Sequence, residues 1–484
     1  MTESNSNRTI ALIVLITMGA FFIRLPGLEK RPMHGDEANQ AYKTGILLED
    51  GTYVYDPHDH HGPSLYYVTL IPAFITGHST FDSTTETTYR IVPVIFGSAL
   101  ILLSLLLRPA LPPAAIIASA LLVTVSPAFV FYSRYYIQET LLVFFTLASI
   151  GIGYRFLKSP SILSAILLGA SLSLMHATKE TAVIAYVAMI AGLAAVYVSY
   201  RSSDTVTSIK STVTRKHLIA IALTAVVINI VLYTAFFTHA RGPLDSILTY
   251  GNYLKRATGA GLHDKPWYYY LQLLVYTNKG PQYWFSEAFP LILATPLIIA
   301  TLAKFRSRSA EQPTPMLLFL TVYTLTLTLI YSIIPYKTPW TMLSFYHGFI
   351  LLSGCAFAQG FGKLKTLPVR ATFIIVCFAG LSHLAYQSYL TNHVIPADPR
   401  NPYVYAHTST AFMKMPQRVD DIHAVHPNPE EMRVYIIQPD ADYWPLPFYL
   451  RKHPNVGFFS TVPENPDADI IIAAPSTRTV LAER

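Results

Sequence analysis

The strongest constraint on this 484-residue sequence is a series of apolar segments, each long enough or nearly long enough to form a bilayer-spanning helix. Such a helix needs about 20 residues. Only 13% of the residues are charged, too few to cover the surface of a soluble protein of this size. The sequence therefore predicts an all-α polytopic membrane protein with about 11 transmembrane helices. The segments cover residues 9–25, 89–107, 113–132, 137–157, 161–175, 181–199, 218–238, 288–303, 316–334, 340–358 and 369–387.

The charges in the connections between these segments predict the orientation in the membrane. With the N-terminus placed inside, the inner connections and the segment ends next to them carry 14 Lys and Arg against 3 Asp and Glu, and the rest of the chain carries 21 against 25. This excess of inner positive charge is the positive-inside pattern. We predict a plasma-membrane protein with a cytoplasmic N-terminus. The net charge of +7 then reflects topology, and no nucleic-acid partner is expected.

Two parts of the chain outside the membrane are long enough for structure of their own. The first external connection, 26–88, includes a half-apolar stretch, 64–77, that is typical of a helix lying in the membrane interface. The last part, 391–484, holds 13 of the 34 prolines and three short β-like runs. We predict a membrane domain over 1–390 and a small extracytoplasmic α/β domain over 391–484. The runs are Val434–Ile437, Val456–Phe459 and Ile470–Ala473, and a short helix is predicted between Trp444 and Lys452.

A carboxylate pair, Asp36 and Glu37, follows His34 in a Pro-Met-His-Gly turn soon after the first membrane segment. A carboxylate in this place could act as a general base, which takes the proton from an attacking hydroxyl. Acidic residues are also favoured at the start of a helix, such as one over 37–48, where they cap it and interact with its dipole. From these residues alone, both interpretations stay open.

A second polar cluster in the same connection contains His58, His60 and His61 around an aspartate. These imidazoles could hydrogen-bond to a phosphate or a sugar, or they could simply face solvent in a polar loop. Two of the three histidines are sequence neighbours, and no spaced ligand set completes a tetrahedral metal site. No metal site and no cofactor are therefore predicted, and whether a metal assists stays open.

Three short external turns carry charged and aromatic residues that a plain helix connection does not need. Their cations could bind a phosphate and stabilise it as a leaving group, and their carboxylates could supply a second acid. The alternative is that the cations anchor helix ends at the interface beside aromatic rings. The candidates are Arg134, Tyr135 and Glu139 in the first turn, Lys179 and Glu180 in the second, and Tyr336, Lys337 and Trp340 in the third.

The central parts of the predicted membrane segments contain no Asp, Glu, Lys or Arg. Ion-coupled transporters and proton pumps place such groups near the middle of the bilayer. Their absence favours chemistry at the outer membrane surface.

The order of these motifs resembles the GT-C membrane glycosyltransferases. It resembles in particular the prokaryotic branch, related to protein O-mannosyltransferases, that includes the archaeal flippase-activity-associated proteins. The similar motifs are His34-Gly35-Asp36-Glu37, Tyr55-Asp56-Pro57-His58, His61-Gly62-Pro63, Tyr135-Tyr136-x-x-Glu139, Ala177-Thr178-Lys179-Glu180-Thr181, Tyr336-Lys337-Thr338-Pro339-Trp340 and Trp444–Arg451. The resemblance spans roughly residues 10–455.

This resemblance implies a protein-glycosylation or cell-envelope transferase that takes a hexose from a polyprenyl-phosphate donor. It implies that Asp36 is the catalytic base and Glu139 the acid of the second external connection. The partners would be the lipid-linked donor, membrane lipids and an acceptor that is a protein or a glycan. The alternative is a flippase for polyprenyl-linked saccharides, or its non-enzymatic accessory protein. A flippase should place polar groups along a path through the bilayer, so the charge-free segments favour the transferase.

Overall fold

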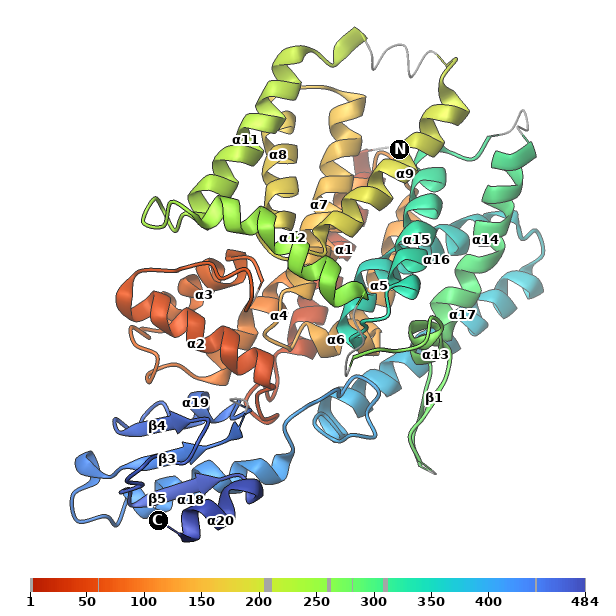
Figure 1. Cartoon of the computed structure of the whole chain (residues 1–484). Helices are drawn as coiled ribbons and strands as arrows, with labels where there is room; N and C mark the ends of the chain where they lie inside the picture. Colours follow the sequence, from red (N-terminus) through yellow and green to blue (C-terminus); the bar gives the residue numbers. More distant parts are fainter. Residues whose placement is uncertain are drawn as a thin grey trace.

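The structure is a computed structural model that describes residues 3–59, 61–203, 211–258, 263–280, 282–307, 312–439 and 442–483. Helices make up most of the molecule (Figure 1). Within the described residues, nine helices are long and apolar enough to cross a membrane, which confirms an all-α multi-pass membrane protein. They are α1 (Glu3–Arg24), α4 (Glu86–Leu103) continued by η1 (Ser104–Leu107), α7 (Glu139–Lys158), α9 (Ala182–Tyr200), α11 (Arg215–Tyr233), α14 (Ala288–Ser307), α15 (Pro315–Ile333), α16 (Leu343–Lys363) preceded by η2 (Pro339–Met342), and α17 (Leu367–Tyr389) continued by η3 (Leu390–Val394).

Two of the eleven predicted segments form helices that are shorter than these spans. The segment 113–132 is divided into α5 (Pro113–Val125) and α6 (Pro127–Tyr132). Pro127 has no N–H with which to continue the first helix. The Ser126 side chain instead accepts a hydrogen bond from the Phe129 N–H at 3.3 Å and begins the second. The segment 161–175 forms α8 (Ile162–His176), which packs against α7 and α11.

The first long connection folds as two helices, as its sequence predicts. These are α2 (Gly35–Asp50) and α3 (Ser64–Ile75), and they lie together beside the ends of the membrane helices (Figure 1). A capping box begins α2, in which the Glu37 carboxylate accepts from the His34 N–H at 3.1 Å. Gly51 ends α2 with φ 66°, a left-handed conformation that glycine adopts without strain. The position of the Asp-Glu pair is thus fixed by the way this helix starts.

The Tyr- and Trp-rich connection between α11 and α14 contains short elements. They are α12 (Gly242–Thr258), α13 (Tyr269–Val275) and a two-stranded hairpin of β1 (Thr277–Asn278) and β2 (Trp284–Phe285). A bridge pairs Asp264 with Tyr336, and this brings the connection against the turn before η2.

The C-terminal part forms a parallel sheet with strand order β4-β3-β5. Val434 pairs with Val456 on one side and with Ile470 on the other, and the three predicted strands are confirmed. Its elements are η4 (Thr410–Met413), α18 (Lys414–His423), η5 (Pro429–Glu431), β3 (Val434–Ile437), α19 (Leu446–Tyr449), β4 (Val456–Phe459), β5 (Ile470–Ala473), η7 (Pro475–Thr477) and α20 (Arg478–Ala482).

This C-terminal sheet docks on the first long connection rather than standing apart from it (Figure 1). The Tyr449 hydroxyl accepts from the Met33 N–H at 2.8 Å, and the Arg451 guanidinium donates to the carbonyl oxygens of Phe81 and Thr84. The rings of Tyr42 on α2 and Trp444 lie edge to face. The docking encloses the start of α2.

Candidate active site

A cavity of about 720 Å³ lies where the start of α2 and the turn before η2 meet two segments of the C-terminal part, 405–412 and 442–445. Four of the residues predicted from the sequence line it, namely His34, Asp36, Tyr336 and Trp340. The volume lies within the range of small-molecule sites. Segments far apart in the sequence therefore build one hollow around the predicted base.

Asp36 lies in the first turn of α2, and 47% of its side chain is exposed. Its backbone N–H donates to Nδ1 of His34 at 3.0 Å. Because Nδ1 of His34 accepts, the hydrogen of the neutral ring lies on Nε2. This turn thus offers the cavity a carboxylate that can accept a proton and an imidazole N–H that can donate a hydrogen bond.

An aromatic wall surrounds this turn. The rings of His34 and His407 stack with centroids 5.8 Å apart, and Trp340 lies edge to face with His34 at 5.7 Å. Nε2 of both histidines is buried and has no hydrogen-bond partner among the described residues. Burial, together with the positive charge of Arg31, holds the pKa of His407 well below its usual value, so this imidazole is neutral. Flat rings with free polar edges suit a sugar, which has apolar faces and hydroxyl edges.

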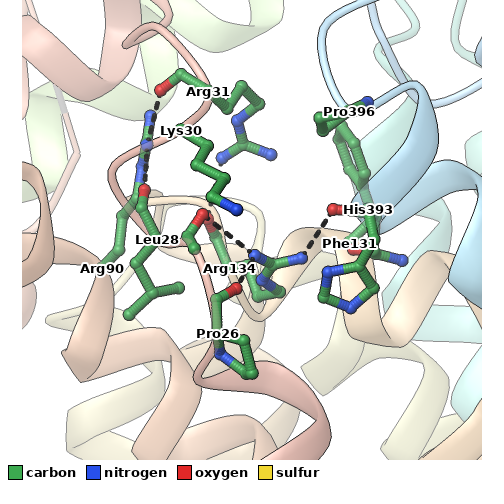
Figure 2. Close-up of a pocket in the computed structure, with 11 residues that line it drawn as sticks. Pro26, Leu28, Lys30, Arg31, Arg90, Phe131, Arg134, His393 and Pro396 are labelled. Atoms are coloured by element: carbon green, nitrogen blue, oxygen red, sulfur yellow. Dashed lines mark hydrogen bonds between the residues drawn. The ribbon is translucent and has the colours of Figure 1, made fainter.

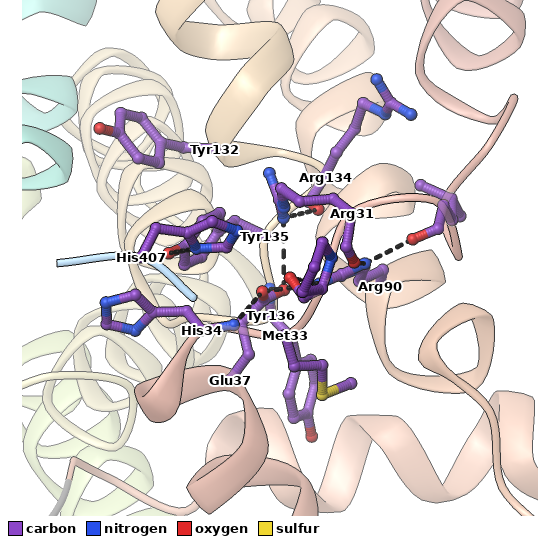
Figure 3. A network of polar contacts seen from close by, with 12 residues as sticks. Arg31, Met33, His34, Glu37, Arg90, Tyr132, Arg134, Tyr135, Tyr136 and His407 are labelled. Carbon is purple, nitrogen blue, oxygen red and sulfur yellow. Dashed lines mark hydrogen bonds and ion pairs between the residues drawn. The ribbon is translucent and has the colours of Figure 1, made fainter. Parts of the chain in front are cut away.

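Glu37 has its carboxylate in a buried ion-pair cluster beside the cavity (Figure 3). Arg90 donates two hydrogen bonds to it, at 2.8 and 2.7 Å, and Arg31 lies 3.4 Å away. The N–H of Tyr136 donates to the same carboxylate at 2.9 Å. Burial raises the pKa of a carboxyl, but the two guanidiniums and these hydrogen bonds outweigh it and hold the pKa of Glu37 well below its usual value. This carboxylate holds the start of α2 against α4 and does not line the cavity.

Four other predicted residues form two further polar contacts. The Lys179 ammonium pairs with the Glu139 carboxylate at the start of α7. The Glu180 carboxylate accepts from the Tyr55 hydroxyl at 3.0 Å and lies 2.7 Å from Nδ1 of His61. Burial raises the pKa of Glu180, but the contact with His61 outweighs it and lowers this pKa to about 2. None of these side chains lines the cavity of about 720 Å³.

The remaining predicted cations are held by backbone oxygens. The Arg134 guanidinium donates to the carbonyls of Asn392 at 2.8 Å and Pro26 at 2.6 Å. The Lys337 ammonium donates to the carbonyls of Lys265 and Ile334, which fixes the turn that carries Tyr336 and Trp340. Tyr135 lies under the Arg31 guanidinium at 4.3 Å. His58 is exposed, with its N–H donating to Asp56, and His60 lies outside the described residues.

Gly62 allows the His-Gly-Pro turn to approach the backbone of the Lys179 turn. A Cβ at Gly62 would lie 2.2 Å from the carbonyl oxygen of Ala177, which accepts the Ser64 N–H at 2.9 Å. We expect Gly62→Ala to separate the two turns and to lower the stability by about 1–3 kcal/mol. Thermal unfolding of the purified protein measures this effect. Gly251→Ala is the control, because a Cβ there meets nothing within 4 Å. Equal melting temperatures for both variants would contradict the close approach.

The sequence motifs missed several residues of the cavity. His263, Tyr405 and His407 line it, but they come from two connections with no recognisable pattern. The sequence gives only an indirect signal for Tyr405 and His407. The segment after the last membrane helix is rich in proline and aromatic residues, which marks a separate part of the chain but no individual site residue. Within the described part of the chain, no group of three His, Cys, Asp or Glu side chains is placed to hold a metal ion.

Residues 15–242 match the family model of dolichyl-phosphate-mannose–protein mannosyltransferases. The matched region contains the Asp-Glu pair, the His-Gly-Pro turn and the turns of Arg134 and Lys179. No curated protein sequence gives a significant match.

Several solved structures share the fold over nearly the whole chain. ArnT from Cupriavidus metallidurans, bound to undecaprenyl phosphate, has a TM-score of 0.64 at 14% identity, with 97% of this chain and 94% of ArnT covered. The oligosaccharyltransferase AglB from Archaeoglobus fulgidus has a TM-score of 0.60 at 12% identity, with 98% of this chain and 65% of AglB covered.

The protein O-mannosyltransferase Pmt1-Pmt2 complex of S. cerevisiae, bound to its sugar donor, has a TM-score of 0.60 at 10% identity. The two structures align over 85% of this chain and 92% of the yeast chain. The chain is therefore similar to the protein mannosyltransferase family over residues 15–242, and it shares its overall fold with ArnT, AglB and the Pmt1-Pmt2 complex.

Proposed function

We propose that the protein transfers a hexose from a polyprenyl-phosphate donor to an acceptor hydroxyl in the cavity at the start of α2. The observation that carries this proposal is the state of its carboxylates. Asp36 is exposed to the cavity, whereas Glu37 is held by two arginines and Glu139 by Lys179. Among the three predicted acids, Asp36 is the one whose carboxylate can accept a proton from a bound hydroxyl.

In the proposed reaction, Asp36 takes the proton of the acceptor hydroxyl. The oxygen of that hydroxyl attacks the anomeric carbon of the sugar at the same time. A carbon–oxygen bond to the acceptor forms, and the bond to the phosphate oxygen breaks. The electron pair leaves with polyprenyl phosphate. A positioned base of this kind accelerates a reaction by about 10²–10⁴-fold.

The aromatic wall would hold the sugar. Trp340 and Tyr336 offer ring faces, and Nε2 of His34 and Nε2 of His407 are left for hydrogen bonds to sugar hydroxyls. Direct contact of Arg134, Lys179 or Lys337 with the donor phosphate stays a prediction, because protein oxygens bind each of these cations here. Glu139 likewise stays a prediction as the second acid, as do His58, His60, His61, Tyr135 and Glu180 as substrate ligands.

We also propose that residues 1–390 form the membrane domain and residues 391–484 a domain that covers the site. Asp442 and Trp444 from the C-terminal part line the cavity with the first connection, which supports this role. The acceptor, a protein or a glycan, would then approach between this domain and α2.

Transfer of radioactive sugar tests the function. We would incubate the purified protein in liposomes with polyprenyl-phosphate hexoses that carry labelled sugar, and follow the label into acceptor peptides and glycans. The proposal expects labelled product and free polyprenyl phosphate in equal amounts. If labelled donor instead crosses the bilayer with its sugar–phosphate bond intact, the protein is a flippase and the proposal fails.

The positive-inside pattern supports an outer location for the cavity. We expect a membrane-impermeant thiol reagent to label Ser83→Cys and Glu464→Cys in intact cells but not Ser202→Cys. All three positions are exposed, and the native Cys355 and Cys377 are buried. Labelling of Ser202→Cys alone would reverse the orientation and place the donor on the cytoplasmic face.

A further inference from the structure

A second, smaller cavity of about 100 Å³ is lined by Arg31 and Arg90 of the Glu37 cluster, and it shares no lining residue with the first cavity. It is formed by the chain after α1, the end of α6 and the end of η3 (Figure 2). Four cationic side chains line it: Lys30, Arg31, Arg90 and Arg134. No Asp or Glu is among its described lining residues.

The positive charge around this cavity is not balanced by the described residues. Arg31, Arg90 and Arg134 are all at least 94% buried, and the Glu37 carboxylate accepts hydrogen bonds from only the first two. Arg134 is bound by neutral carbonyl oxygens, and the exposed Glu29 is the acid whose charge acts on it. A buried charge without a counter-charge is costly, so an excess of buried guanidiniums indicates an anion.

Two buried donors remain available at this place. Nε of Arg31 and Nε of Arg134 are buried and have no hydrogen-bond partner among the described residues. Figure 2 shows Lys30, Arg31 and Arg134 converging on the same space, with His393 on its other side. Burial and the like charges of Arg31 and Arg90 lower the pKa of Arg134 to about 9. This lowered pKa is a second sign that positive charge exceeds negative charge at this place.

The location restricts the source of the anion. The span of α1 ends at Arg24, and the span of α17 and η3 ends at Val394, so the cavity lies just beyond two membrane helices. Phosphate headgroups of lipids lie at this level of a bilayer. Guanidinium and ammonium groups together are the donors that proteins use for phosphate.

We propose that this second cavity binds a phosphate group, separately from the sugar-transfer site, through Lys30, Arg31 and Arg134. The phosphate would stabilise the junction of α1, α6 and η3 by neutralising their buried cations. It belongs either to the headgroup of an anionic lipid or to free inorganic phosphate.

Thermal unfolding of the full-length protein in detergent tests the proposal without using activity. The protein would be titrated with phosphatidylglycerol and with diacylglycerol, which has the same tails but no phosphate, and with inorganic phosphate against chloride at equal ionic strength. A ligand that binds only the folded state raises the melting temperature. We expect a rise with phosphatidylglycerol or inorganic phosphate and none with diacylglycerol or chloride. A rise with the lipid alone identifies a headgroup, and a rise with inorganic phosphate identifies the free ion.

Variants assign the effect to this cavity. Lys30→Ser should raise the phosphate or lipid concentration needed for half the stabilisation at least fivefold, and Lys30→Arg should restore the wild-type value. Lys30 is exposed, and its side chain makes no hydrogen bond or ion pair with the described residues, so its loss breaks no structural contact of this kind. Lys279→Ser removes an exposed lysine from the β1–β2 hairpin and should match wild type. Arg134→Gln should weaken phosphate binding further, but it also removes the hydrogen bonds to Asn392 and Pro26, so the Lys30 variants decide the test. Equal titrations of Lys30→Ser and Lys279→Ser, or no rise for wild type with either phosphate source, would overturn the proposal.

Discussion

Replacing Asp36 with Asn is expected to lower the rate of sugar transfer by about two to four orders of magnitude. An amide has the shape of the carboxylate but cannot take a proton from the acceptor. The side chain is about half exposed and is not part of the buried ion-pair cluster around Glu37. Folding and donor binding should therefore stay close to wild type. Initial rates with labelled donor, compared at equal amounts of folded protein, measure the effect.

Asp50→Asn is the matched control, because Asp50 is an exposed acid at the other end of the same helix. It should leave turnover within threefold of wild type. If Asp36→Asn also turns over within threefold of wild type, Asp36 is not the base, and Glu139 becomes the acid to test.

Replacing Glu37 with Gln should have a large effect of a different kind, on stability. The change leaves Arg90 and Arg31 buried without their counter-charge, and breaking one side of a buried ion pair costs about 3–5 kcal/mol. The yield of folded protein and its melting temperature should both fall. Glu49→Gln, on the exposed end of α2, should change the stability by less than about 1 kcal/mol.

The double variant Glu37→Met with Arg90→Met separates structure from catalysis. Removing both charges should recover part of the stability that Glu37→Gln loses, because neither partner is then left buried and unpaired. If Glu37→Gln instead folds with the wild-type melting temperature but cannot transfer sugar, Glu37 is the base. The ion pair with Arg90 would then not be what holds the start of α2.

Much of the fold could be predicted from hydropathy and turn chemistry. Apolar length located the nine long helices, and β-branched runs located the three strands of the C-terminal sheet to the residue. The break between α5 and α6 follows from Pro127, whose effect was hidden in a continuous apolar run. The docking of Tyr449 and Arg451 on the first connection is a long-range contact, and a single sequence gives no pattern for such contacts.

The candidate site was predictable in its residue types more than in its arrangement. The residue pattern alone did not separate Asp36 from Glu37, although the family resemblance singled out Asp36. The ion pair of Glu37 with Arg90, more than fifty residues away, now distinguishes the two carboxylates. The cations at Arg134, Lys179 and Lys337 could be recognised from the sequence. Their distant partners, the carbonyls of Pro26 and Lys265 and the Glu139 carboxylate, could not. His407 has no motif, and its place opposite His34 depends on how the C-terminal part packs.

The position of the bound donor distinguishes sugar transfer at Asp36 from transport of the intact donor. A cryo-EM structure of the Asp36→Asn protein with a polyprenyl-phosphate hexose would show the sugar before transfer. We predict that the sugar lies in the cavity of about 720 Å³, against Trp340 and His34, with its anomeric carbon facing residue 36. A sugar bound along the membrane helices, away from this cavity, would contradict the account and favour a flippase.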